Sequence, residues 1–413
     1  MRGSNLKPPL LAALVLLPIL GSSGPLTAED APRNLREALA RGTASLAFRY
    51  RLEQVDDSGV SSGKDASAST LRTSLGYKTA PFKGLHFFVE AENVATVGND
   101  QLFRNVGAGS ASNGVTDRPV VADPALTELN QVWIELERGE TRFRAGRQEI
   151  NIGDQRFVGA VGWRQNHQSF DGLKIVNGSL ERVSLTYAFV DSVQRIFGDS
   201  KDMSSHLVEA RFTLSDAARV TGYAYVLDYD RVADSNLSTA TLGAELAGHH
   251  PLGNNRKLLY ELEAARQRDA GDNPSEIEAE YFHGLLGIAS ARLTAKAGWE
   301  RLDGSPSDGQ FRTPLATLHK FNGWADKFLN TPVNGLDDIY LLLTGKAGKL
   351  GWTAVFHDFA AATGSGSYGE ELDLQLTYPT ACGLALGFKA ALFDADSHSA
   401  DTEKLMLWTT YKF

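Results

Sequence analysis

The chain ends in the stretch LWTTYKF, residues 407–413, which alternates between apolar and polar positions up to its last residue. In an extended strand the odd-numbered residues from Leu407 to Phe413 lie on one side and the even-numbered residues lie on the other. Chain ends are usually frayed and polar, because little holds them in place. A strand that continues to the final residue indicates pairing with neighbouring strands along both of its edges.

The same alternation recurs along most of the chain. It is clear in SLAFRYRLE at 45–53, in TLRTSLGYK at 70–78 and in ARLTAKAGWE at 291–300. Counting such runs predicts roughly eighteen strands of about ten residues, the length and even number expected of a transmembrane antiparallel β-barrel. The predicted strands begin at about residues 43, 67, 84, 126, 141, 168, 181, 204, 217, 236, 256, 276, 291, 336, 349, 370, 383 and 402.

The connections between these strands alternate in length. The segments APFKG, GE, NGSLE and SDA are tight, whereas the segments 55–66, 95–126, 150–167, 192–202 and 304–335 are longer. Short periplasmic turns and long extracellular loops are typical of outer-membrane barrels. A soluble all-β protein, the other architecture that the composition allows, has no reason to sort its loops in this way. The last strand is therefore predicted to close the barrel against the first, with Tyr411 and Phe413 at the periplasmic interface as an assembly signal.

The beginning of the chain predicts export from the cytoplasm. Arg2 and Lys7 precede an apolar run that is too short for a transmembrane helix and suits a secretory signal. We expect a signal peptide at 1–28, a periplasmic segment at 29–42 that can form one short helix, and the barrel at 43–413. Without the signal, 39 basic residues (41 minus 2) stand against 50 acidic ones, a net charge of −11 that argues against nucleic-acid binding.

The inward faces of the predicted strands are rich in charge. If the apolar faces meet lipid, the lumen receives a set of basic side chains: Arg49, Arg51, Arg72, Lys78, Arg142, Arg144, Lys174, Arg211, Lys296 and Lys389. Guanidinium groups suit carboxylate recognition, because their fork matches a carboxylate bidentately. Acidic residues such as Glu53, Glu261 and Glu263 have the same parity, so a lattice of salt bridges is the alternative interpretation, and the sequence leaves both open.

The loop 150–167 carries arginines of a different kind, since it lacks clean alternation and is rich in glycine. We expect it to fold into the pore and to present Arg156 and Arg164 there; an ordinary extracellular loop is the alternative. Arg147 is assigned to the same selectivity region, although its parity points away from the lumen. Either a bulge at Gly146 turns it inward, or it lies above the membrane.

A second loop contains FNGWADKFLNTP, residues 321–332. Trp324 and Phe328 lie one helical turn apart, which predicts a short amphipathic helix packed at the barrel mouth. We interpret it as a loop anchor, with Asp326 or Lys327 paired with one of the arginines. No recognisable catalytic arrangement is present, and the single cysteine, Cys382, allows neither a disulfide framework nor a cysteine zinc site. The sequence predicts no enzyme, metal site or cofactor.

Two long motifs carry a family resemblance. They are TRFRAGRQEINIGDQRFVGAVGWRQNHQSFDGLKIV at 141–176 and TLHKFNGWADKFLNTPVNGLDDIY at 317–340. Together with SLAFRYRLEQV in the first strand and the C-terminal phenylalanine, they resemble the alginate export family of Gram-negative outer-membrane proteins. The resemblance implies a monomeric eighteen-stranded barrel whose pore is narrowed by inward loops and lined by arginines.

We therefore expect an integral outer-membrane channel that passes an anionic or polar solute by passive diffusion, with a polyuronate such as alginate as one candidate. A porin specific for small carboxylates is the first alternative, and a barrel enzyme or adhesin is a weaker one. The expected partners are the lipid bilayer, the barrel-assembly machinery, and the anionic solute or polysaccharide.

Overall fold

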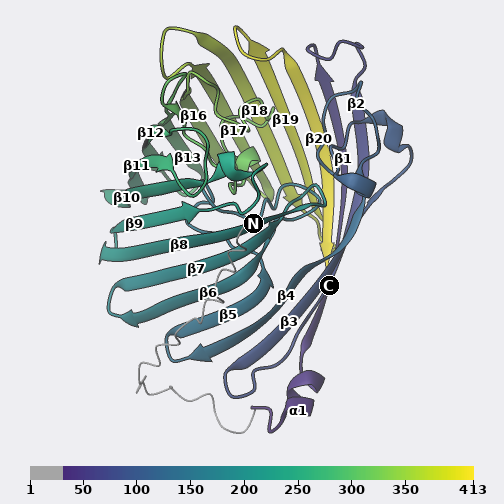
Figure 1. Cartoon of the computed structure of the whole chain (residues 1–413), viewed down its shortest axis with the longest axis vertical. Coiled ribbons are helices and arrows are strands. Elements are labelled where there is room, and N and C mark those ends of the chain that lie inside the picture. Colours follow the sequence, from purple (N-terminus) through teal and green to yellow (C-terminus); the bar gives the residue numbers. More distant parts are fainter. Residues whose placement is uncertain (1–30) are drawn as a thin grey trace, which may run out of the picture.

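The computed structural model describes residues 31–413, which form a closed barrel with very little helix (Figure 1). The predicted signal peptide, 1–28, lies outside the described residues. A short helix, α1 (Leu35–Ala40), precedes the first strand, within the segment where the sequence predicts one. The Asn34 side chain caps it by accepting a hydrogen bond from the backbone N–H of Glu37. No helix among the described residues is long and apolar enough to cross a membrane.

The wall of the barrel is one sheet of eighteen antiparallel strands. In chain order they are β1 (Thr43–Asp57), β2 (Ala66–Lys78), β3 (Leu85–Thr96), β4 (Leu126–Arg138), β5 (Thr141–Gln148), β6 (Ser169–Leu180), β7 (Val183–Gln194), β8 (Ser200–Ser215), β9 (Ala218–Leu227), β10 (Thr239–Gly253), β11 (Arg256–Asp269), β12 (Glu278–Ala289), β13 (Leu293–Leu302), β16 (Leu336–Ala347), β17 (Leu350–Ala360), β18 (Ser367–Pro379), β19 (Ala385–Ala395) and β20 (Thr402–Lys412). Two short strands, β14 (Gly304–Ser305) and β15 (Gly309–Gln310), pair with each other in a loop outside this sheet.

Each strand of the wall pairs with its neighbours in the sequence, and β1 also pairs with β20. This last pairing leaves no open edge, which a sheet in lipid requires because no water is present to satisfy unpaired backbone groups. Every predicted strand start lies within four residues of the observed one, the largest difference being 204 against 200 at β8. The prediction of an eighteen-stranded barrel is confirmed.

The connections sort by length to the two ends of the barrel. At one end, called the turn end, strands are joined by short segments such as 139–140 and 254–255. At the other, the loop end, the long connections include 97–125, 149–168 and 303–335. Because the strand number is even, α1 and the C-terminus both lie at the turn end (Figure 1).

The last residue is tied to the first strand. The Phe413 backbone N–H donates a hydrogen bond to the Leu46 carbonyl oxygen at 2.9 Å. Its ring contacts those of Phe48 and Tyr411, with centroids 6.2 and 4.6 Å away, and the residue is 70% exposed. Strand β20 is therefore paired along its length, which accounts for an alternation that continues to the end of the sequence.

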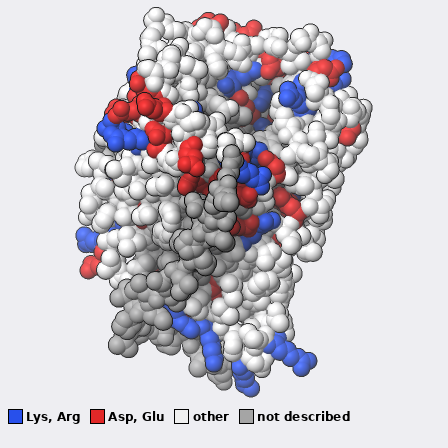
Figure 2. Space-filling model, viewed as in Figure 1, with Lys and Arg blue, Asp and Glu red and all other residues white. Residues whose placement is uncertain are grey.

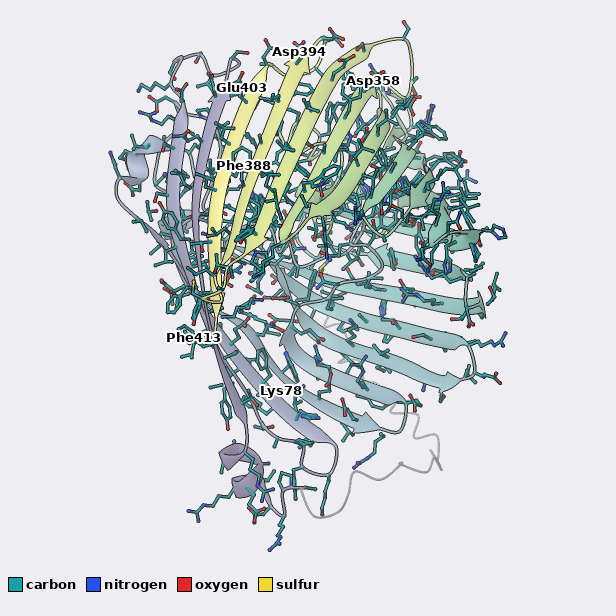
Figure 3. The ribbon with its side chains drawn as sticks, turned by 180° about the vertical axis from the view of Figure 1, so that it is seen from behind. Lys78, Asp358, Phe388, Asp394, Glu403 and Phe413 are labelled. Atoms are coloured by element: carbon teal, nitrogen blue, oxygen red, sulfur yellow. The ribbon has the colours of Figure 1, made fainter. Side chains whose placement is uncertain are left out.

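The outer face of the wall is apolar in its middle and acidic near the loop end. On β20, Leu405 and Leu407 are exposed, and Glu403 continues the same outward parity towards the loop end. Asp358 and Asp394 have equivalent outward positions on β17 and β19, and Figure 3 shows these three acids near the upper ends of their strands. The same view places Phe413 at the opposite end of β20. The apolar band that meets lipid lies between these two levels.

Candidate functional site

The loop 149–168 lies inside the barrel and reaches opposite parts of the wall. On one side, Phe157 packs against Tyr223 and Tyr281 of the inner face, with ring centroids 5.4 and 5.3 Å away. On the other side, the Gly162 carbonyl oxygen accepts a hydrogen bond from Arg49 Nη1 on β1 at 3.1 Å. The loop therefore narrows the lumen, and side chains of the wall hold it there.

Arg156 fastens this loop to β13. Its Nε donates to Glu300 at 2.6 Å, and its Nη2 donates to the Asn322 side chain at 3.0 Å. The guanidinium also lies over the ring of Phe321, 4.8 Å from its centroid. Arg156 is only 2% exposed, so its charge is neutralised by Glu300 and does not face the open lumen.

Arg164 is the centre of a second buried ion-pair group. Its Nη1 lies 3.3 Å from Glu53 on β1, and its Nη2 lies 2.7 Å from Asp326 in the loop 303–335. Lys404 on β20 contacts the same Asp326 oxygen at 2.7 Å. Burial alone would raise the pKa of Asp326, but His319, Lys404 and Arg164 hold it well below its usual range. Both inward loops are thus fixed to the seam where the barrel closes.

Arg49, Arg51 and Arg72 also hold the loop 149–168, largely through its backbone. Arg51 Nη1 donates to the Trp163 carbonyl oxygen at 2.6 Å, and Arg51 also pairs with Asp123. Arg72 Nη1 reaches the Gln165 carbonyl oxygen at 3.4 Å and a His167 ring nitrogen at 3.0 Å. These arginines position the loop, a role that the alternation of the strands did not predict.

The segment 317–328 is not the amphipathic helix that the sequence predicted. Residues 318–320 form one 3₁₀ turn, after which Asn322, Gly323 and Asp326 all have positive φ angles, of 54°, 83° and 63°. Left-handed residues interrupt a helix. The backbone instead satisfies carboxylates of β18: the Ala325 N–H donates to Glu371 at 2.7 Å. The predicted pairing of Asp326 with an arginine is present, and Lys327 pairs with Asp57 at 2.8 Å.

Trp324 lies inside the barrel, against a lysine of β19. The Lys389 ammonium lies between two indole rings, 3.8 Å from the Trp163 centroid and 4.0 Å from that of Trp324. His319 stacks on Trp163 at 4.7 Å, and one of its ring nitrogens is 3.0 Å from Lys389 Nζ. This arrangement joins both inward loops to β19 through cation–π contacts.

Protonation of His319 should weaken this anchor. Burial, with smaller contributions from Lys389 and Arg164, lowers the pKa of His319 to about 3, although Asp326 opposes the shift. Because the pKa is lower while the loops occupy the lumen, this arrangement is fully stable above about pH 6.5 and loses stability as the pH falls towards 3. At pH 5 the loss for a released, solvated histidine is about 2 kcal/mol.

Single-channel recordings should therefore show more frequent opening at pH 5 than at pH 7. H319Q should remove the dependence, whereas H206Q should keep it, since His206 lies on the outer face beside Tyr187. Equal opening at both pH values in the unmodified protein would contradict this account.

Arg147 lies outside the pore, so its assignment to the selectivity region is wrong. It pairs across strands with Val132 and Asp171, while Gly146 keeps the regular register and forms no bulge on β5. The Arg147 guanidinium binds the Asp171 carboxylate bidentately, at 2.8 Å for both contacts. The Arg147 side chain therefore points outward, as its position in the alternation indicates, and the ion pair lies on the outer wall near the loop end.

Of the remaining basic residues of the predicted set, Arg211 and Lys296 lie on the inner faces of β8 and β13, and the other four line the lumen near the turn end. Arg144 contacts Glu135 at 2.6 Å and lies over the Trp133 ring. Lys78, Arg142 and Lys174 differ from it: no carboxylate oxygen of the described residues lies within 4.0 Å of their charged nitrogens. These three are called the free basic group. The interior thus has two regions. Salt bridges surround the inward loops, and basic side chains without carboxylate partners lie between these loops and the turn end.

Two cavities lie on opposite sides of the inward loops. The outer cavity, of about 1050 Å³, is lined by Arg164 and Asp326 together with residues of the long loops. The inner cavity, of about 540 Å³, is lined by tyrosines and charged residues of β8 to β13, including Glu263 and His283. In Figure 2 charged side chains gather around the central hollow, and most of the visible wall carries none.

Comparison with known proteins agrees with this architecture. OpdK of Pseudomonas aeruginosa, in a crystal structure with vanillate, superposes with a TM-score of 0.72 at 14% identity, over 91% of this chain and 99% of that one. OccK9 (OpdG) of the same organism gives 0.72 at 16% identity, again over 91% and 99%. OccAB1 of Acinetobacter baumannii gives 0.72 at 12% identity, over 91% and 97%. No curated protein matches the sequence.

The closed barrel and its sequence relationship define an integral β-barrel channel of the outer membrane. The profile of the family described as Alginate export matches residues 42–303. The chain belongs to this family, as the two sequence motifs predicted.

Proposed function

We propose that the channel passes anionic solutes by passive diffusion along the basic side chains of its lumen. The observation that carries this proposal is the free basic group, Lys78, Arg142 and Lys174, which no nearby carboxylate neutralises. Such a charge is available to a passing anion. Several weak sites in succession let the anion advance without being trapped.

Three arginines of the outer cavity support the same proposal. Arg104, Arg118 and Arg312 line this cavity, and none has a carboxylate oxygen of the described residues within 4.0 Å. Basic side chains outnumber the acidic Asp57, Asp117 and Asp326 in this lining, and an excess of one sign of charge raises the local concentration of the opposite ion. Basic groups at both ends of the passage therefore favour anions at entry and at exit.

We infer that the solute is a small carboxylate. The loops 149–168 and 303–335 separate the two cavities, which share no lining residue, and buried ion pairs hold both loops. A polymer would require both loops to move. OpdK, whose fold is similar, was crystallised with vanillate, a small aromatic carboxylate. Membership of the alginate export family makes a polyuronate the second candidate.

Uptake into proteoliposomes distinguishes these solutes. Glucuronate should enter about tenfold faster than glucose, since one favourable charge contact near a surface contributes on the order of 1 kcal/mol or more. A uronate oligomer of about ten residues should enter far more slowly than glucuronate, because its passage requires both inward loops to move. Comparable entry of the oligomer would favour the polymer, and faster entry of glucose would contradict anion transport.

We further propose that the chain is a monomeric channel without enzymatic activity, inserted by the barrel-assembly machinery through its terminal aromatic residues. The tie between Phe413 and β1 supports a role in closure. Deleting Phe413 should reduce the compact, heat-modifiable band on gels, while the conservative variant F413Y should restore it. Normal assembly of the truncated chain would show that the last residue is dispensable.

A further inference from the structure

The inner cavity contains a row of facing polar side chains that the inward loops only partly neutralise. Thr221, Glu245, Glu263, His283 and Glu300 are direct cross-strand partners on β9, β10, β11, β12 and β13. All of them line the cavity. Glu245 and Glu263 stand directly opposite each other, and like charges in that position destabilise a sheet. A positive charge between these strands would offset the repulsion between the two carboxylates.

Most carboxylates of the row have a basic partner. Glu300 forms an ion pair with Arg156, and Glu245 forms one with Arg219 Nη2 at 2.8 Å. Glu263 differs: among the described residues no Lys, Arg or His nitrogen lies within 4.0 Å of its oxygens, and one of them accepts a hydrogen bond from the Tyr223 hydroxyl at 2.6 Å. Glu261, two residues earlier on the same face, has His283 as its only basic neighbour within that limit in the described part of the chain, at 3.2 Å.

We propose that Glu261, Glu263 and His283 bind a divalent transition-metal cation on the lumen wall. One oxygen of each carboxylate and one ring nitrogen of His283 all lie within 4.8 Å of one another. Small side-chain rotations can bring three such atoms to the roughly 2.0–2.2 Å that zinc requires. Two carboxylates and an imidazole suit Zn²⁺ or Mn²⁺ better than a soft ion. All three residues line the inner cavity, from which water can complete the coordination.

Two tyrosine hydroxyls form hydrogen bonds with the proposed ligands, as outer-shell groups do in known metal sites. The Tyr340 hydroxyl lies 2.8 Å from Nε2 of His283, which leaves Nδ1 towards Glu261. The Tyr223 hydroxyl donates to Glu263 and fixes that carboxylate in turn. Hydrogen bonds to the far side of a ligand set its orientation and strengthen metal binding. Both the imidazole and one carboxylate of the proposed site have this support.

A buried hydroxyl in the same cavity also lacks a partner. Thr221 is 3% exposed, and its Oγ1 forms no hydrogen bond with any described residue. Because Thr221 lies directly opposite Glu245, it faces the space beside Glu263. Buried polar groups are normally satisfied by protein or ordered water. A hydrated cation in the cavity brings water that can reach this hydroxyl.

One lysine offers a competing explanation. Lys296 lines the cavity and has no carboxylate of the described residues within 4.0 Å. If its charge alone balanced the two glutamates, a cation would have to displace it. Replacing Lys296 therefore tests whether it competes with the ion. The variant K296M should bind the ion at least as tightly as the unmodified chain.

Isothermal titration of the purified, untagged barrel in detergent with ZnCl₂ alone tests the site, independently of anion transport. One ion should bind per chain. E261Q and E263Q should each weaken binding about 100-fold, and Y340F about tenfold, as expected for a ligand and for a group that orients one. E209Q is the matched control, because Glu209 lines the same cavity but pairs with Arg211, and it should leave affinity unchanged.

Each variant is first checked for the heat-modifiable band, so that loss of binding is not loss of folding. No binding by the unmodified chain would overturn the proposal. Binding that persists in the E261Q/E263Q double variant and disappears in H249N/H250N would also overturn it, because the ion would then sit at the histidine pair near the turn end.

Discussion

Arg164→Ala should raise the conductance of the channel several-fold. The substitution leaves Glu53 and Asp326 buried, with one positive partner each, Arg51 and Lys404. Removing one member of a buried ion pair typically costs about 3–5 kcal/mol, because a desolvated charge remains. Here that cost acts on the closed arrangement of the loops, while the backbone pairing of the strands is unaffected. The loops should therefore detach and the lumen should widen.

Arg147→Ala is the matched control for this experiment. It removes the same side chain from a partly exposed pair on the outer wall, where the loss is expected to be at most about 1 kcal/mol. Its conductance should equal that of the unmodified protein. If R164A leaves the conductance unchanged, the buried ion pairs do not hold the loops; if R147A changes it, the assignment of Arg147 to the outer face is wrong.

Removing the free basic group should abolish most of the anion preference. In the triple variant K78Q/R142Q/K174Q, a passing anion no longer meets these three charges near the turn end, whereas Lys296 and the ion pairs of the inward loops remain. At separations near 4 Å each charge contributes on the order of 1 kcal/mol in water and more in a narrow lumen. The ratio of anion to cation permeability should fall at least about tenfold, with a small change in conductance.

The control triple variant R182Q/R256Q/K349Q removes the same net charge from exposed residues at the short turns. Its selectivity should stay close to that of the unmodified channel. If both triple variants lose selectivity equally, net charge rather than the free basic group determines the preference.

The architecture could be predicted because strand pairing in a membrane obeys local rules. Alternation, even strand number and the parity of loop lengths are all visible in short windows of sequence, and they located each strand of the wall. The outward parity of Arg147 was likewise visible, and assigning it to the pore required a bulge that β5 does not have.

The contacts of the inward loops could not be predicted in the same way. Arg156 meets Glu300, 144 residues later in the sequence, and Arg164 meets Asp326, 162 residues later. No periodic pattern encodes such distances. The helical spacing of Trp324 and Phe328 misled because Asn322, Gly323 and Asp326 adopt left-handed conformations that only the surrounding wall stabilises. The proposed metal ligands were missed because Glu263 and His283 meet through strand register.

The zero-current potential of the unmodified channel in a planar bilayer under a steep KCl gradient tests the central claim most directly. Unneutralised Lys78, Arg142 and Lys174 predict a potential with the sign of chloride preference, which should decrease as salt screens these charges. A potential with the sign of potassium preference would show that the acidic side of the lumen dominates, and it would contradict the anion channel proposed for this protein.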